Sequence, residues 1–173
     1  MPALSELIER SARALSKGYY SEAQTESAIL HVFGPDSRLI ADGTYFAAEE
    51  NGRLAGCGGW SRRRTLYGGD QMRAQEDPLL DPSEEPARIR AFFVHPDFAR
   101  RGVGSRILEA CLDAARAAGF RRVTLASTLP GVPFYRAFGF EEHERLDVPL
   151  PDGLRLPVVR MERDVVLAVR GDG

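Results

Sequence analysis

The stretch from residue 89 to residue 127 constrains the fold most, because it contains a strand, a basic glycine turn, a helix and a second strand. The first strand reads IRAFFV at 89–94, the turn reads RRGVGS at 100–105, and apolar residues then recur at helical spacing as far as Gly119. A second strand-like run covers residues 122–127. Two strands joined through a helix run parallel in one sheet, with a right-handed crossover as the strong default. The sequence therefore predicts a β-α-β unit in the middle of the chain.

The turn inside this unit has the chemistry of a phosphate site. The first N–H groups of a helix have no partner inside the helix and lie at the positive end of its dipole, so they stabilise an anion. Gly102 and Gly104 lack a Cβ, which lets the backbone approach a bulky diphosphate, and Arg100 and Arg101 add charge at the rim. We therefore expect a diphosphate-bearing ligand at this turn.

The rest of the chain predicts helices and hairpins on both sides of the unit. Ser21 and Gln24 match a capping box, and Asn51-Gly52 is the strongest short-range hairpin signal. No internal repeat or linker divides the chain, so we expect a single domain over residues 1–173. The predicted helices cover residues 4–15, 22–33 and 133–137, and the predicted hairpins pair 44–50 with 53–60 and 140–150 with 154–165.

Residues 68–86 lack a periodic pattern and are rich in acids. The segment has Gly-Gly, three prolines and six acidic residues against the single Arg73. It is interpreted as a long surface loop, and such loops are often functional in compact domains. Two interpretations stay open: a solvated insertion, or an acidic surface that attracts a cationic amine, with Trp60, Tyr67 and Met72 offering apolar contacts.

Composition excludes several classes of function. A net charge of −2 over 173 residues argues against broad nucleic-acid binding, which needs a basic face. Cys57 and Cys111 are far apart and the three histidines lack metal-ligand spacing, so we expect reduced thiols, a core position for Cys111 and no metal. No apolar run approaches the roughly 20 residues of a membrane span, and the first ten residues carry acids. The default expectation is a cytoplasmic protein without a membrane partner.

Two motifs at their observed separation carry a family resemblance. FVHP at 93–96 with the turn that follows it, and PFYRAFGF at 133–140 after the second strand, together resemble the GNAT superfamily of acyl-CoA-dependent N-acyltransferases. The motifs span about residues 88–140. The flanking helices and hairpins extend a compatible order over nearly the whole chain.

The resemblance implies an α/β fold with a mixed, mostly antiparallel central sheet flanked by helices. Two parallel strands, near 88–94 and 122–127, would splay apart to form the acyl-CoA cleft. It further implies that Tyr135 is the general acid which protonates the leaving thiolate, and that the Val94 N–H stabilises the oxyanion. Alternatively, Tyr135 is a core aromatic residue whose hydroxyl only binds. The implied cofactor-binding residues are Phe93, Val94, Arg100, Arg101, Gly102, Val103, Gly104 and Ser105.

The sequence departs from the family pattern at several positions. Ala99 replaces the Gln or Arg that often opens the phosphate loop, Thr128 replaces a common Asn, and Arg88 stands where some members have a catalytic Glu. No motif assigns a general base. The family's usual first strand has no counterpart before Leu4: it is lost, lies upstream, or is replaced at the sheet edge by another segment. Candidate bases are Glu49, Glu50, His95 and the acids of residues 70–85.

Two functions follow from these observations. The favoured one is an enzyme that transfers an acetyl group from acetyl-CoA to a primary amine of a small molecule or peptide by direct attack, acting as a monomer or homodimer. The alternative is an acyl-CoA-binding sensor or regulatory module without turnover. A nucleoside-triphosphate enzyme is disfavoured, because the turn lacks the Gly-Lys-Ser/Thr ending that contacts phosphate and magnesium.

Overall fold

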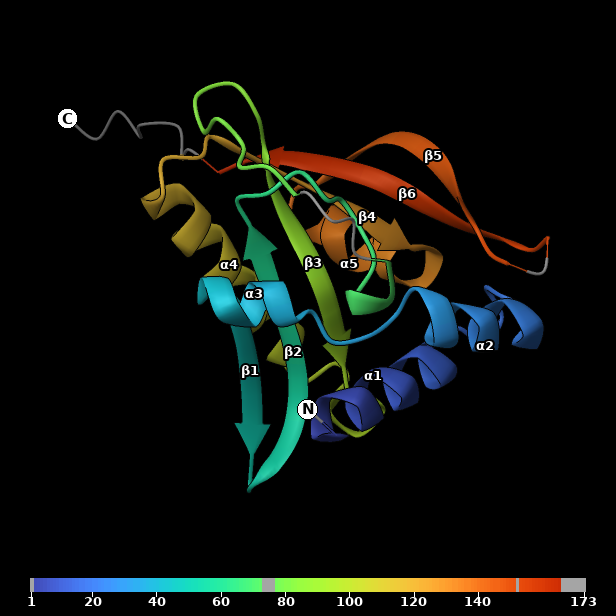
Figure 1. Cartoon of the computed structure of the whole chain (residues 1–173). Helices are drawn as coiled ribbons and strands as arrows, with labels where there is room; N and C mark the ends of the chain where they lie inside the picture. The colour runs from blue at the N-terminus through green and yellow to red at the C-terminus, as the bar shows by residue number, and fades with distance from the viewer. Residues whose placement is uncertain (1, 73–76, 152, 166–173) are drawn as a thin grey trace.

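A six-stranded sheet forms the centre of the molecule (Figure 1). The structure is a computed structural model that describes residues 2–72, 77–151 and 153–165. The strand order is β1-β2-β3-β4-β6-β5, and every neighbouring pair is antiparallel except β3 and β4, which are parallel. The predicted mixed sheet with one parallel pair is therefore confirmed. The strands are β1 (Tyr45–Glu50), β2 (Arg53–Ser61), β3 (Ala87–Val94), β4 (Arg122–Thr128), β5 (Glu141–Pro149) and β6 (Arg155–Asp164).

Helices cover both faces of this sheet. Figure 1 shows α3 in front of β1 and β2, whereas α4 lies behind them. Helices α4 and α5 share one apolar cluster with the sheet, and α1 and α2 each pack into clusters of their own. None of the helices in the described part of the chain combines the length and apolar character needed to cross a bilayer. The helices are α1 (Pro2–Leu15), α2 (Glu22–His31), α3 (Ser37–Asp42), α4 (Val103–Ala117) and α5 (Val132–Ala137), with 3₁₀ turns η1 (Asp70–Met72), η2 (Pro96–Phe98) and η3 (Leu129–Gly131).

The local signals in the sequence produce these elements directly. The Ser21 hydroxyl accepts from the Gln24 N–H, and the Gln24 side chain accepts from the Ser21 N–H, so the capping box at α2 is confirmed. Asn51 and Gly52 have φ of 53° and 75°, as the tight turn between β1 and β2 requires. Helix α3 was not predicted. It has only six residues, although the cap at Asp36 marks its start.

Two glycines of β2 allow α4 to pack closely on the sheet. A Cβ on Gly56 would lie 2.9 Å from Val103 Cγ1, and one on Gly58 would lie 2.5 Å from the Phe92 ring and 3.1 Å from Ile107. The distances of 2.9 Å and 2.5 Å are too short for real side chains and 3.1 Å is tight, so larger residues here would displace α4 and the Phe92 ring. Cys111 is buried on this face of the sheet, as predicted.

Two expectations about the acidic segment need correction. Trp60 is only 3% exposed and packs edge-on against Phe120 at 6.0 Å between ring centroids, so it offers no surface to a ligand. The segment is also not wholly a surface loop, since Asp77 and Leu80 are buried. Asp77 pairs with the guanidinium of Arg90 at 3.4 Å, and an isolated antiparallel bridge joins Leu79 to Arg63, just after the end of β2. Residues 73–76 lie outside the described residues, and they include Arg73 and Glu76 of the predicted acidic loop.

The parallel strands separate soon after they begin. Their pairing comprises Ala87 with Val123 and Arg88 with Thr124, and β4 continues beside β6 alone. A bulge in β3 accompanies the separation: Ala91 has φ of 52°, and two residues of β3 stand opposite one of β2. Bulges bend a strand and increase its twist, which carries the end of β3 away from β4. The predicted splayed pair is confirmed.

Candidate active site

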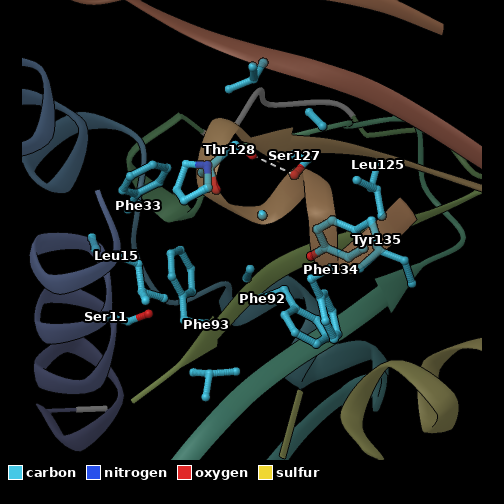
Figure 2. A pocket seen from close by; sticks show the side chains of 18 of the residues that line it. Ser11, Leu15, Phe33, Phe92, Phe93, Leu125, Ser127, Thr128, Phe134 and Tyr135 are labelled. Carbon is cyan, nitrogen blue, oxygen red and sulfur yellow. Dashed lines mark hydrogen bonds between the residues drawn. The ribbon is translucent and has the colours of Figure 1, made fainter. Parts of the chain in front are cut away.

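The gap between the splayed strands opens into a cavity of about 630 Å³. Its lining comes from β3, β4, the turn before α4, and α5. Residues of α1, the segment after α2, residues 66–69 and the β5–β6 hairpin close the other side. Figure 2 shows Phe92, Phe134 and Tyr135 across the cavity from Leu15 and Phe33. The cavity thus reaches from the predicted phosphate turn to the predicted catalytic tyrosine.

The turn before α4 presents open backbone to one end of this cavity. Gly102 is the N-cap of α4 with φ of 83°, and a Cβ placed on it would meet no heavy atom within 4 Å. As a glycine, the N-cap has no side chain to accept from the first N–H groups of the helix, and such N–H groups can stabilise an anion. Gly104 fits between Phe134 and Val94, where a Cβ would lie 3.3 Å and 3.4 Å from their side chains.

The cavity brings together six of the eight predicted cofactor-binding residues. Arg101 instead extends toward the end of β1, with its guanidinium 3.6 Å from the Glu50 carboxylate and over the Phe98 ring. Val103 packs against the core on the α4 face. The six residues that line the cavity are Phe93, Val94, Arg100, Gly102, Gly104 and Ser105.

Backbone groups of β3 point into the gap between the two parallel strands. The His95 N–H donates to the Ala55 carbonyl of β2 at 2.8 Å. Successive N–H groups of a strand point to opposite edges, so the N–H of Val94 points toward the gap. The bulge just before it is anchored, because the Tyr45 hydroxyl donates to the Ala91 carbonyl at 3.0 Å.

Tyr135 lies in an aromatic cluster with its hydroxyl directed at the cavity (Figure 2). Its ring contacts Phe134 at 5.1 Å, Phe140 at 5.6 Å and Phe92 at 6.0 Å between centroids. Within the described part of the chain, its hydroxyl makes no hydrogen bond to protein. Burial raises the pKa of the phenol well above its usual value, because a phenolate would be poorly solvated here. The group can therefore donate a proton at neutral pH and is unsuited to act as a base.

The candidate bases lie away from the cavity. His95 is buried and its Nδ1 accepts from the Asp97 N–H at 3.1 Å, which makes it the cap of η2. Arg88, at the position where some family members have a catalytic Glu, donates to the Pro86 carbonyl at 2.7 Å. Glu49, Glu50, Asp70 and Asp77 are absent from the lining. Among the described lining residues the charged side chains are those of Arg90 and Arg100, and none is a carboxylate.

Sequence reasoning missed the wall opposite Tyr135 and the buried charges behind it. Leu15 and Phe33 come from separate helical segments, and only the fold brings them to β3 and α5. Arg90 is buried beside Asp36 and Asp77, with close contacts to both carboxylates. The sequence did contain one signal for this buried pairing: Arg90 lies in a predicted central strand, and a charged residue is rarely buried there unless it is paired.

Comparison with known proteins connects this geometry to an enzyme family. The model of the acetyltransferase (GNAT) family matches residues 4–140. An uncharacterized N-acetyltransferase of Methanocaldococcus jannaschii is 36% identical over 63 residues, which are 35% of this chain and 28% of that protein. The chain therefore aligns with less than a third of the length of this curated relative.

Solved structures share the fold. A GCN5-related N-acetyltransferase from Rhodopseudomonas palustris matches with a TM-score of 0.68 and 19% identity, over 94% of this chain and 88% of that one. The PaiA N-acetyltransferase from Thermoplasma acidophilum, solved in complex with coenzyme A, matches with a TM-score of 0.62 and 15% identity, over 94% and 91%. At such low identity the likeness concerns the fold.

Proposed function

Because the chain belongs to the acetyltransferase (GNAT) family, we propose that it transfers an acetyl group from acetyl-CoA to a primary amine of a small molecule or a peptide. One observation carries this proposal. A single cavity links the N-terminus of α4, the edge of β3 toward which the Val94 N–H points, and the buried hydroxyl of Tyr135. These are the features needed to hold a diphosphate, to stabilise an oxyanion and to supply a proton.

The residues present fit coenzyme A. The space beside Gly102 is open, so the diphosphate can contact the first N–H groups of α4 and the guanidinium of Arg100. The backbone of Phe93 and Val94 borders the gap in which the pantetheine arm would pair with β3. Arg101 contributes mainly to the local potential, since its side chain is engaged with Glu50. All eight predicted positions remain proposed contacts, mostly through the main chain.

In the proposed reaction, the neutral amine attacks the thioester carbonyl carbon directly. The Val94 N–H donates to the carbonyl oxygen as it becomes negatively charged. When the C–S bond breaks, Tyr135 gives its proton to the departing sulfur, and it regains one through water from the attacking nitrogen, which carries a positive charge after the attack and must lose a proton to become the amide nitrogen. The products are the acetylated amine and free coenzyme A, and no other reactant is needed.

The cavity itself aids deprotonation of the amine. No carboxylate lines it in the described part of the chain, and most of its lining is apolar. An ammonium group is poorly solvated in such surroundings, which lowers its pKa and favours the neutral, nucleophilic form. Water at the open mouth of the cavity can take the released proton. This arrangement accounts for transfer without a dedicated base at Arg88 or His95.

The absence of a carboxylate in the described lining also favours the second candidate, a domain that binds acyl-CoA without turnover. Titration calorimetry with acetyl-CoA, followed by release of free thiol in the presence of primary amines, separates the two. The enzyme proposal predicts saturable binding and amine-dependent thiol release. Binding without release on any amine would support the sensor, and no binding would refute both.

The protein's own thiols should give no background signal in the thiol-release assay. Cys57 and Cys111 are its two cysteines, both fully buried. Burial raises the pKa of the Cys57 thiol to about 11 and that of Cys111 to about 12, so neither forms a reactive thiolate near neutral pH. Native protein without acetyl-CoA should therefore give no signal with a disulfide reagent. Unfolded protein should give two equivalents.

A further inference from the structure

We propose that the acceptor is a monoamine with a bulky apolar arm, and that amines with a second cationic group are poor acceptors. The inference rests on the proposed acetyl transfer and specifies its substrate class. It follows from the part of the cavity that faces Tyr135, which we name the acceptor wall. The acceptor wall comprises Leu15, Tyr19, Phe33, Leu66, Tyr67 and Leu156.

The acceptor wall is apolar and comes from four separate parts of the chain. Figure 2 shows Phe33 and Leu15 pointing into the cavity from the side opposite Phe134 and Tyr135. Phe33 is held in place by an edge-on contact with Phe93, with ring centroids 5.6 Å apart. Leu15 and Tyr19 at the mouth are 42% and 52% exposed, so apolar surface is left in water where a ligand would cover it.

The charges around the cavity disfavour a second ammonium group. Two charged side chains belong to the described lining residues: Arg100 is positive, and Arg90 is buried and neutralised by Asp36 and Asp77, so neither offers a carboxylate to the ligand. Two described acids of the neighbouring segment are engaged elsewhere: Asp77 pairs with Arg90, and Asp70 accepts from the N–H and hydroxyl of Ser37 at 3.0 Å each. A distal ammonium would lose water in the cavity and find no carboxylate to replace it.

This charge distribution opposes the alternative left open by the sequence, in which the acidic segment attracts a polyamine. Of the acids in that hypothesis, Asp70 and Asp77 hold protein groups, and Glu76 lies outside the described residues. The apolar arm is instead recognised by burial against Phe33 and Leu156, which rewards aromatic or branched aliphatic groups.

A matched pair of amines tests the proposal. Hexylamine and 1,5-diaminopentane have nearly equal length, and differ in whether the far end is a methyl or an ammonium group. With acetyl-CoA saturating, we expect kcat/KM for hexylamine to exceed that for the diamine by about tenfold or more, since the apolar end is buried and the charged end is not tolerated. Equal values, or a preference for the diamine, would overturn the proposal.

Two variants test whether the acceptor wall causes the preference for hexylamine over 1,5-diaminopentane. Phe33→Ala should raise KM for hexylamine about tenfold, as expected for loss of a buried ring contact, and leave the Kd for acetyl-CoA unchanged. Leu15→Glu, at a partly exposed position that tolerates charge, should shift the selectivity ratio toward the diamine. The matched control is Leu30→Ala, whose side chain is 67% exposed and outside the cavity, and it should change neither value. A selectivity ratio unchanged in both wall variants would refute the assignment.

Binding measurements separate this proposal from the proposed function. Titration calorimetry of each amine into protein saturated with coenzyme A reports on the wall without turnover. Tighter binding of hexylamine than of the diamine supports the acceptor proposal even if no thiol is released. In that case only the proposed acetyl transfer is refuted. No binding of either amine, or tighter binding of the diamine, refutes the acceptor proposal.

Discussion

Tyr135 is the side chain on which the proposed chemistry most directly depends. It is buried among aromatic rings, yet its hydroxyl faces the cavity and lacks a protein partner in the described part of the chain. A core tyrosine usually directs its hydroxyl to a partner. Tyr20 illustrates this, because its hydroxyl donates to the Pro157 carbonyl at 2.6 Å and accepts from the Leu129 N–H at 2.9 Å. The contrast favours a chemical role for Tyr135.

Replacement of Tyr135 by phenylalanine should lower kcat about 100-fold, because the departing thiolate loses its proton donor. The Kd for coenzyme A should stay within about twofold, since the ring and its packing are retained. Steady-state kinetics and calorimetry measure the two quantities. Leu30→Ala, an exposed position outside the cavity, serves as the control. An unchanged kcat at every pH in Tyr135→Phe would contradict the acid role.

The pH dependence of the wild-type enzyme follows from the same burial. Because burial raises the pKa of Tyr135, the protonated acid persists to a pH above the usual value for a phenol, about 10. The free amine, in contrast, becomes more abundant as the pH rises. We expect kcat/KM to increase from pH 6 to pH 9 without a falling limb in that range. A decline between pH 7 and pH 9 would show that a group with a lower pKa supplies the proton.

The proposed anion binding at the turn before α4 depends mainly on the conformation of the backbone. Gly102 has φ of 83° and open space around its missing Cβ, and Arg100, two residues earlier, also has a positive φ of 62°. This conformation turns the chain into α4 and exposes the first N–H groups of the helix. A side chain at Gly102 would strain the backbone and occupy the space proposed for the diphosphate.

Gly102→Val should therefore weaken acetyl-CoA binding by at least about tenfold, because the branched side chain excludes the diphosphate from the helix N-terminus. Gly43→Val is a matched control: Gly43 has φ of 74°, also has no heavy atom within 4 Å of its missing Cβ, and lies outside the cavity. Both variants should lose similar stability, about 1–2 kcal/mol, from backbone strain alone. Calorimetry and denaturant unfolding measure the two effects. Equal acetyl-CoA affinity in the two variants would contradict the assigned site.

A buried charge cluster joins distant parts of the molecule. Arg90 on β3 contacts Asp36 at the start of α3 and Asp77 in the segment after β2, and Arg38 approaches Asp77 at 3.8 Å. Arg90 and Asp36 are 6% and 1% exposed. A charge left unpaired in such a place is costly, so the cluster ties α3 and the acidic segment to the sheet.

Asp36→Asn should lower the free energy of unfolding by about 3 kcal/mol, because Arg90 loses a buried counter-charge while Asp77 remains near it. Asparagine still caps α3, so the loss reports the charge and not the cap. Asp97→Asn removes an exposed partner of Arg53 and should cost less than about 1 kcal/mol. Denaturant unfolding measures both. Equal losses in the two variants would show that the cluster does not stabilise the fold.

Short-range signals were enough to predict most elements and the turn at which we propose that an anion binds. The capping box at Ser21, the Asn51-Gly52 turn and the glycines of the turn before α4 each act within a few residues, so their consequences can be inferred locally. The β-α-β unit follows in the same way, since a helix between two strands makes them parallel. Tyr135 could be singled out only through the family resemblance of its motif.

The contents of the cavity depended on contacts between residues far apart in the chain. The bulge at Ala91 has no sequence signal, because alanine rarely adopts a positive φ and is held there by the Tyr45 hydroxyl. The orientation of Arg101 away from the turn, the burial of Asp77 beside Arg90 and the meeting of Phe33 with Phe93 are further long-range outcomes. Local patterns determine where helices, strands and turns form, since those interactions span few residues. Which side chains share a cavity is determined by packing, which is a property of the whole chain.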